Sequence, residues 1–286
     1  MDQHGDTGAA FDFFVESLQQ IVGAHRSTLK TIFVKREGQL MTLIVSSVTA
    51  HGIALAADSM LTQKSRAFSG RELTRFLTNC KKIVPIERLK GAVSMWGDAE
   101  GMHQEGHEVD TDCWLADMIG DAAHFGTIGN FAEEVRRQLE AIRKPGAPVV
   151  GFHISGYEKD GPVLYHVRND DDDPKSGKFR CVREISPGES KLIRNGDYAT
   201  FGHLFDTVLP AMDRLLTLGK EIPHPSLPGV LFYQMAWIRF VSDLYRAAQL
   251  PTLIGVPVYG HSIAPDGTFE TYCDYELVSQ DKWSMS

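Results

Sequence analysis

The sequence predicts an α+β fold in which two antiparallel sheets pack face to face and helices cover their outer faces. Strand-like and helix-like segments occur in blocks along the chain, in the order strands, helices, strands, helices, strands. Blocks of this kind suit antiparallel sheets, because a parallel sheet requires a crossover connection between successive strands. The chain has 286 residues, of which 43% are apolar, so it can bury a substantial core without disulfides.

The first block of strands predicts two hairpins. The apolar runs 42–49 and 52–58 flank a short link that contains glycine, as a hairpin requires. The runs 81–86 and 91–98 follow the same plan and are separated by a short polar turn. We therefore expect four strands before the first helix.

Two helices are expected next, over 112–126 and 130–144. The second is the stronger prediction, because Asn130 is a candidate N-cap and the acidic residues precede the basic ones before Pro145.

The rest of the chain predicts strands, then long helices, then a closing strand pair. The expected segments are strands over 148–157, 162–168 and 189–197, a solvated loop over 169–178, helices over 200–219 and 228–249, and strands over 252–264 and 267–277. The helix over 228–249 is apolar on more than one face, so we expect it between layers or at a subunit contact.

Composition excludes several functional classes. The net charge of −8 argues against a nucleic-acid-binding surface, which is normally basic. The four cysteines form no CxxC pair, and reduced thiols are expected. No apolar run approaches the roughly 20 residues that span a bilayer. The first residues carry acids where a secretory signal carries Lys or Arg, so we expect a cytoplasmic protein.

The sequence has no motif for a metal or a cofactor, so we expect the protein to use neither. The segment "HQEGH" over 103–107 has the wrong order for a zinc-protease helix, in which Glu directly follows the first His. We interpret it as an exposed polar turn. The sequence contains no P-loop, no dinucleotide fingerprint and no G-x-S-x-G elbow.

Three polar residues stand at the ends of the first apolar runs. Thr42 begins one run, Asp58 ends the next, and Lys82 lies at the start of the third. Each has an ordinary interpretation on its own, as a strand threonine, a turn former and a solvated edge charge. Burying a carboxylate at the end of a strand nevertheless costs free energy of folding unless it is paired, so Asp58 implies a partner or a function.

The combination resembles the proteasome β-subunits, their HslV-type bacterial relatives and the ancestral β-like bacterial homologues, which are N-terminal-nucleophile (Ntn) hydrolases. In mature chains of that family the nucleophilic threonine is the first residue. A glycine turn and an apolar strand follow, and the strand ends at an aspartate. Thr42, Gly52 and "IALAAD" ending at Asp58 keep this spacing. Lys82, in the segment "NCKKIVPI", matches the lysine of the family's motif.

The resemblance implies a four-layer αββα Ntn-hydrolase sandwich over residues 42–286, preceded by a propeptide or upstream extension over 1–41. A short amphipathic helix within 1–41 is a second interpretation of that segment. The likeness extends over residues 42–275, and its specific motifs lie in the first part of that range.

The resemblance also implies catalytic roles. The Thr42 hydroxyl would be the nucleophile, and its own amine, with an ordinary pKa near about 8, would be the base. Lys82 would lower the pKa values of both groups, and Asp58 would orient Lys82. The backbone N–H of Ser94 would stabilise the oxyanion. One departure is that Arg194, Asn195 or Gly196 stands where the family has a serine beside the amine.

We therefore expect a threonine-type endopeptidase that self-associates into a ring or spiral and takes peptides or unfolded proteins as substrates. An ATP-dependent unfoldase is the partner that analogy suggests, and neither nucleic acid nor membrane is expected. The alternatives are an Ntn amidase that acts on a small amide and a catalytically silent shell subunit.

Overall fold

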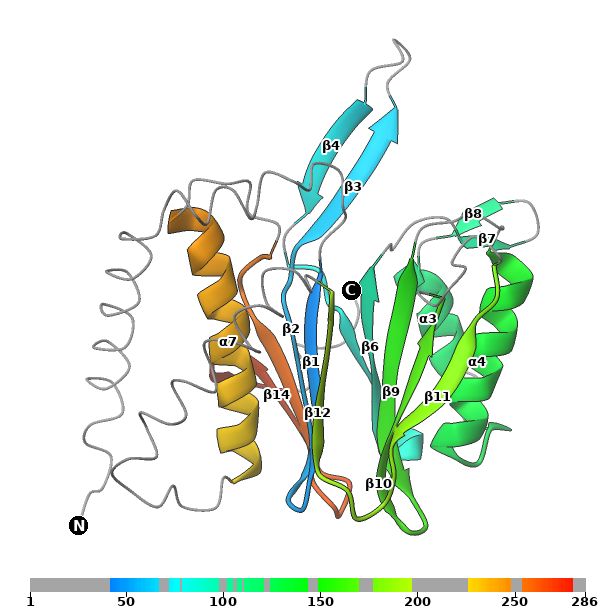
Figure 1. Ribbon diagram of the computed structural model, residues 1–286, viewed down its shortest axis with the longest axis vertical. Coiled ribbons are helices and arrows are strands. Elements are labelled where there is room, and N and C mark those ends of the chain that lie inside the picture. The colour runs from blue at the N-terminus through cyan, green and yellow to red at the C-terminus, as the bar shows by residue number, and fades with distance from the viewer. Residues whose placement is uncertain are drawn as a thin grey trace.

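The computed structural model describes residues 42–66, 72–77, 79–97, 102–104, 107–109, 111–120, 124–143, 149–169, 177–196, 226–247 and 254–279. Within these residues the chain forms two large antiparallel sheets that lie face to face, with a helix layer outside each (Figure 1). This confirms the predicted αββα arrangement. The expected helix over 200–219, most of the loop over 169–178 and the segment 1–41 lie outside the described residues.

The first sheet has six strands in the order β12-β1-β2-β13-β14-β15. Its strands are β1 (Leu43–Thr49), β2 (Gly52–Ala57), β12 (Lys191–Gly196), β13 (Tyr259–Ile263), β14 (Phe269–Cys273) and β15 (Glu276–Val278). The second sheet has five strands in the order β11-β10-β9-β6-β5. Its strands are β5 (Ile83–Ile86), β6 (Gly91–Gly97), β9 (Val150–Glu158), β10 (Gly161–Arg168) and β11 (Arg180–Ile185), with the short helix η1 (Glu87–Leu89) between β5 and β6.

Three α-helices lie among the described residues. The helix α7 (Leu227–Ala247) covers the outer face of the six-stranded sheet, over β1, β2 and β13. The helix α4 (Ile128–Ile142) covers the outer face of the five-stranded sheet over β9, β10 and β11, and α3 (Thr111–Gly120) lies on the same side (Figure 1).

Alternation along β1 and β2 divides the core into layers. Leu43 and Val45 pack in the cluster beneath α7, whereas Ile44 and Val48 pack between the two sheets. Because successive strand side chains point to opposite faces, a strand that is apolar at nearly every position is covered on both sides. The first apolar run is therefore central to the sandwich, and every second residue of it points to the opposing sheet.

The structure corrects several local predictions. The N-cap of α4 is Thr127, whose hydroxyl accepts the Asn130 N–H at 3.1 Å, and Asn130 is already inside the helix. The segment after β6 forms a hairpin of β7 (Met102–Gln104) and β8 (His107–Val109) before the first described helix. His103 and His107 thus lie on two paired strands, as opposed to the single helix turn that a zinc-protease motif requires.

Two further elements were not predicted. One is β11, which continues the five-stranded sheet after the acidic loop. The other is the two-stranded ribbon of β3 (Leu61–Arg66) and β4 (Glu72–Leu77), which projects beyond the sandwich (Figure 1). In the sequence, this ribbon lies between Asp58 and Lys82. The apolar residues of β11 and β4 make up half of each strand but do not alternate regularly with polar ones, and β3 is mostly polar, so hydrophobic alternation did not reveal these strands.

Candidate active site

Thr42, Asp58 and Lys82 meet at one end of the sandwich. Thr42 directly precedes β1, and Asp58 directly follows its antiparallel neighbour β2, so both lie at the same end of the six-stranded sheet. Lys82 directly precedes β5 in the five-stranded sheet. Since the two sheets are stacked, the cluster draws its groups from both of them.

The lysine ammonium joins the other two side chains. Lys82 Nζ lies 2.7 Å from Asp58 Oδ1 and 3.3 Å from Thr42 Oγ1, and it donates to both. Thr42 is 4% exposed, Asp58 0% and Lys82 2%. A hydroxyl is therefore held against a buried cation, which is itself paired with a buried carboxylate.

The Asp58 carboxylate is also bound by backbone groups. Its Oδ1 accepts the Leu43 N–H at 2.9 Å, and its Oδ2 accepts the N–H groups of Met60 at 3.0 Å and Gly255 at 3.1 Å. The Asp58 N–H in turn donates to the Leu43 carbonyl at 3.1 Å. Four donors compensate the cost of burying the carboxylate and fix its orientation.

Lys82 is fixed at its backbone as well as at its ammonium. The Lys82 carbonyl accepts the Met95 N–H at 2.9 Å, which extends the β5–β6 pairing by one residue. The side chain then crosses from the five-stranded sheet to Asp58 in the six-stranded sheet. The relative position of the two sheets therefore sets the distance between the ammonium and the Thr42 hydroxyl.

Gly196 closes the backbone around Thr42. It is the last residue of β12, has φ +114°, and opposes Leu43 in the register with β1. A Cβ at this position would lie 1.5 Å from the Thr42 carbonyl oxygen, so a side chain there is impossible without moving β12 or Thr42. Neither Gly196 nor Asn195 supplies a hydroxyl to Thr42, in contrast to the serine of the resembled family.

Ser94 is placed differently from the sequence prediction. It lies inside β6, opposite Ile83 of β5 and His153 of β9. The Met95 N–H points toward β5, where it donates to the Lys82 carbonyl. Since successive N–H groups of a strand point to opposite sides, the Ser94 N–H points toward β9. The next backbone N–H on the β5 side after Met95 is that of Gly97, which has φ +86° and ends β6.

The Ser94 hydroxyl belongs instead to a buried polar cluster that the sequence analysis missed. Ser94 Oγ lies 3.4 Å from Ser46 Oγ, and His153 Nδ1 lies 2.8 Å from the same Ser46 oxygen. His153 Nε2 lies 2.7 Å from Asn195 Oδ1. The signal available in the sequence was a histidine in the middle of the apolar run 148–157, and serines inside the first apolar run.

A second buried histidine packs on the first. The rings of His153 and His166 meet edge to face with centroids 4.8 Å apart, and Trp96 Nε1 donates to His166 Nε2 at 3.2 Å. Burial lowers the pKa of His153 to about 4 and that of His166 to about 2, with the Arg168 charge acting in the same direction on both. Both rings are therefore neutral at physiological pH.

The neutral histidines predict a loss of stability in acid. In the unfolded chain a histidine binds a proton below about pH 6.5, whereas buried His153 does so only near pH 4. Between these values the unfolded state binds more protons, so the free energy of unfolding should fall as the pH falls, by roughly 3 kcal/mol for His153 alone. Urea unfolding at pH 7 and pH 4.5 measures this difference.

His166→Phe provides the matched comparison, because its ring cannot titrate. The groups that face His166 are His153, Arg168, Trp96 and Glu184, whose Oε1 lies 3.9 Å from His166 Nδ1. The variant should show a shallower dependence on pH than the wild type. Equal unfolding free energies for the wild type at the two pH values would contradict the assignment of neutral histidines.

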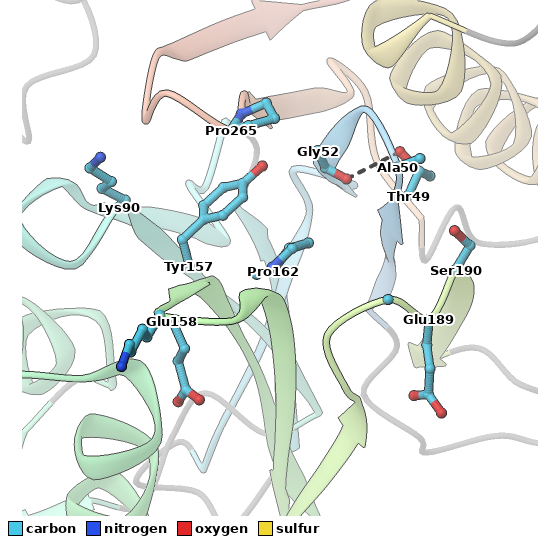
Figure 2. Close-up of a pocket in the computed structure, with 13 residues that line it drawn as sticks. Thr49, Ala50, Gly52, Lys90, Tyr157, Glu158, Pro162, Glu189, Ser190 and Pro265 are labelled. Carbon is cyan, nitrogen blue, oxygen red and sulfur yellow. Dashed lines mark hydrogen bonds between the residues drawn. The ribbon is translucent and has the colours of Figure 1, made fainter.

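Of the pockets lined by described residues, one includes Gly196, which lies against the Thr42 carbonyl. A pocket of about 530 Å³ opens beside Gly196 and Asn195, with Trp96 and His166 in its wall. A larger pocket of about 650 Å³ lies at the other end, among the turns that follow β1, β9 and β11 (Figure 2). Of its acidic groups, Glu158 already accepts bonds from the Gly129 N–H and the Tyr165 hydroxyl. The larger pocket therefore lacks the reactive grouping found around Thr42.

In the described part of the chain, no group of three or more His, Cys, Asp or Glu side chains is arranged to hold a metal ion. Among the same residues, no helix has the length and apolar character needed to cross a bilayer.

Comparison with known proteins gives structural similarity alone. No protein-family model matches the sequence, and no curated protein matches it. Among 165 similar solved chains is one described as "Anbu (Gly-1) mutant from Hyphomicrobium sp. strain MC1". It aligns with 14% sequence identity and a TM-score of 0.41, over 83% of this chain and 85% of the other.

Proposed function

We propose that this chain is a threonine-type peptidase of the proteasome-like kind, which cleaves peptide bonds with Thr42 as its N-terminal nucleophile. The observation that carries the proposal is the buried contact of Lys82 Nζ with both Thr42 Oγ1 and Asp58 Oδ1. A buried ammonium has three N–H donors, and one carboxylate partner need not take all of them. Here the same ammonium also holds a hydroxyl at the end of the sandwich.

The proposed chemistry begins when Thr42 is the first residue. Its free amine takes the hydroxyl proton as Oγ attacks the carbonyl carbon of the substrate, and the carbonyl electron pair moves to oxygen. The tetrahedral intermediate expels the amine product with the proton and leaves an ester on Thr42. Water then hydrolyses the ester, which releases the acid product and restores the hydroxyl.

Lys82 and Asp58 have supporting roles in this scheme. The ammonium favours the anionic form of the hydroxyl that it contacts, because an adjacent positive charge stabilises developing negative charge. Asp58, with its four donors, holds Lys82 in place.

The oxyanion donor is assigned to the end of β6. Ser94 was the residue expected from the sequence, and its N–H faces β9. On the edge that faces Lys82, the Gly97 N–H is the next donor beyond the bond from Met95 to Lys82. We therefore assign this role to Gly97.

Two alternatives remain distinct from this proposal. An Ntn amidase would use the same groups on a small amide, and a silent shell subunit would conserve the fold without turnover. The assembled cluster of Thr42, Asp58 and Lys82 favours an active chain. As the substrate and assembly state, we propose peptides or unfolded proteins inside a ring or spiral of identical subunits, to which an ATP-dependent unfoldase could deliver them.

The nucleophile is tested by substitution. In the form that begins at residue 42, Thr42→Ala should abolish peptide hydrolysis and labelling by an epoxyketone or β-lactone, because the attacking oxygen is gone. Thr42→Ser retains hydroxyl and amine and should keep part of the activity. Peptide mapping of the labelled protein locates the adduct, and casein and small amides as competing substrates separate a peptidase from an amidase. Wild-type rates in Thr42→Ala would refute the assignment.

The ion pair predicts a specific pattern for Lys82. Lys82→Ala should slow acylation by about a hundredfold or more, since a preorganised charge typically contributes several kcal/mol to lowering the barrier. Lys82→Arg should not restore the rate, because a planar guanidinium cannot replace a compact ammonium between two buried partners. Full activity of Lys82→Arg in a stopped-flow or probe-labelling assay would show that the ammonium geometry is unimportant. Lys159→Ala, at an exposed turn at the other end of the sandwich, is the matched control and should leave the rate unchanged.

The N-terminus gives a further prediction. While Met41 is attached, the Thr42 nitrogen is a peptide nitrogen and cannot act as a base. Protein expressed from Met1 should be inactive until residues 1–41 are removed, by attack of Thr42 on the Met41 carbonyl. Protein expressed from Met41 should be trimmed by methionine aminopeptidase, because threonine is small. N-terminal sequencing and activity of both forms decide this, and full activity with residues 1–41 retained would contradict it.

A further inference from the structure

The two halves of the proposed site belong to different sheets, so their spacing requires something that fixes one sheet against the other. Thr42 and Asp58 come from the six-stranded sheet, whereas Lys82 comes from the five-stranded sheet. The core between the sheets is largely aliphatic, as at Ile44, Leu55 and Leu164. Hydrophobic contact is non-directional, and it tolerates small sliding movements that a catalytic hydrogen bond does not.

His153 supplies a directional contact close to the site. It is 0% exposed, and it reaches from β9 across the space between the sheets to two strands of the other sheet. One ring nitrogen meets Ser46 in β1 and the other meets Asn195 in β12. These two strands are neighbours, and they are the ones that carry Thr42 and Gly196.

The proton arrangement in this cluster has one consistent solution. Asn195 Oδ1 can only accept, so His153 Nε2 carries the proton and Nδ1 of the neutral ring is an acceptor. Ser46 must then donate its hydroxyl proton to His153 Nδ1, and Ser94 donates to Ser46. The chain from Ser94 to Asn195 thus runs in one direction and ends on β12.

Ser46 and Asn195, the two partners of His153, lie close to Thr42 along β1 and β12. Side chains at even positions of β1 face the opposing sheet, and Ser46 shares this face with Ile44 and Thr42. Asn195 opposes Ile44, the second residue after Thr42, and the next residue of β12 is Gly196, against the Thr42 carbonyl. A shift of Asn195 therefore moves the backbone that confines Thr42.

We infer that His153, through Ser46 and Asn195, is a positioning residue for the proposed reaction, which locks the two sheets in the register that places Lys82 Nζ against Thr42 Oγ1. The inference rests on the proposed function for its kinetic consequence, while its geometric consequence can be measured in an inactive protein. His153 touches neither Thr42 nor the reacting atoms, and it acts through β1 and β12.

The structure provides a matched control at the opposite end of the sandwich. Tyr157, also in β9, donates its hydroxyl to the Ile263 carbonyl of β13 at 3.1 Å, which is another directional bond between the sheets. It lies among the turns at the end remote from Thr42 (Figure 2). Tyr157→Phe removes one bond between the sheets without disturbing the site.

The experiment compares Asn195→Ala, Asn195→Asp and Tyr157→Phe in the form that begins at Thr42. Asn195→Ala removes the acceptor for His153, and we expect kcat to fall by about tenfold or more with KM nearly unchanged, because the nucleophile is misplaced and substrate binding is not. Asn195→Asp has the same shape and keeps an acceptor oxygen, so it should recover most of kcat. Tyr157→Phe should lower Tm to a similar extent and keep the wild-type kcat. A wild-type kcat in Asn195→Ala together with a lowered Tm would show a structural role alone and overturn the inference.

Crystal structures of wild type and Asn195→Ala give the readout that does not depend on activity. The distance from Lys82 Nζ to Thr42 Oγ1 should exceed hydrogen-bonding range in the variant, and an unchanged distance would overturn the inference. Ser46→Ala, which removes the other partner of His153, gives a second measurement if Asn195→Ala fails to fold. A wild-type protein that a β-lactone does not label at Thr42 would refute the proposed function and leave this geometric test valid.

Discussion

The buried ion pair of Lys82 and Asp58 is the interaction on which the arrangement of this molecule depends. Each group would be costly to bury alone, and removing one partner of such a pair typically destabilises a protein by about 3–5 kcal/mol. The pair joins the two sheets at one end of the sandwich. Asp58 also receives backbone bonds from the start of β1, from the residues before β3 and from the segment before β13. Several parts of the chain thus converge on one carboxylate.

This convergence explains why the Thr42 hydroxyl is so well placed. Leu43 is bonded to Asp58 at both its N–H and its carbonyl, so the backbone next to Thr42 has little freedom. Gly196 confines the Thr42 carbonyl from the other side. A flexibly held nucleophile loses rate through orientational disorder, so these contacts suit the role that we propose for Thr42.

The polar groups between the sheets have different effects from the apolar core around them. The aliphatic core supplies most of the cohesion, but it does not select one alignment of the sheets over a slightly shifted one. Lys82, His153 and Tyr157 each make directional bonds across the gap. Neutral His153 makes two such bonds without burying a charge, because each ring nitrogen has a partner of the right kind. A polar group of this sort adds specificity to the packing at a small cost in stability.

Much of this protein could be predicted from the sequence by itself. Alternation and glycine-containing links predicted the strand pairs and the two-sheet architecture, since hydrophobic periodicity reports directly on which faces are buried. Thr42, Asp58 and Lys82 each stand at the end of an apolar run, and the resemblance to the proteasome-like Ntn hydrolases singled out the three together. The tertiary structure decided the rest. Whether the Ser94 N–H points toward β5 or β9 depends on which residue pairs between the strands are hydrogen-bonded, and the residue types do not determine this. The partners of His153 lie on strands remote in sequence, so only the stacking of the sheets brings Ser46 and Asn195 to its two nitrogens.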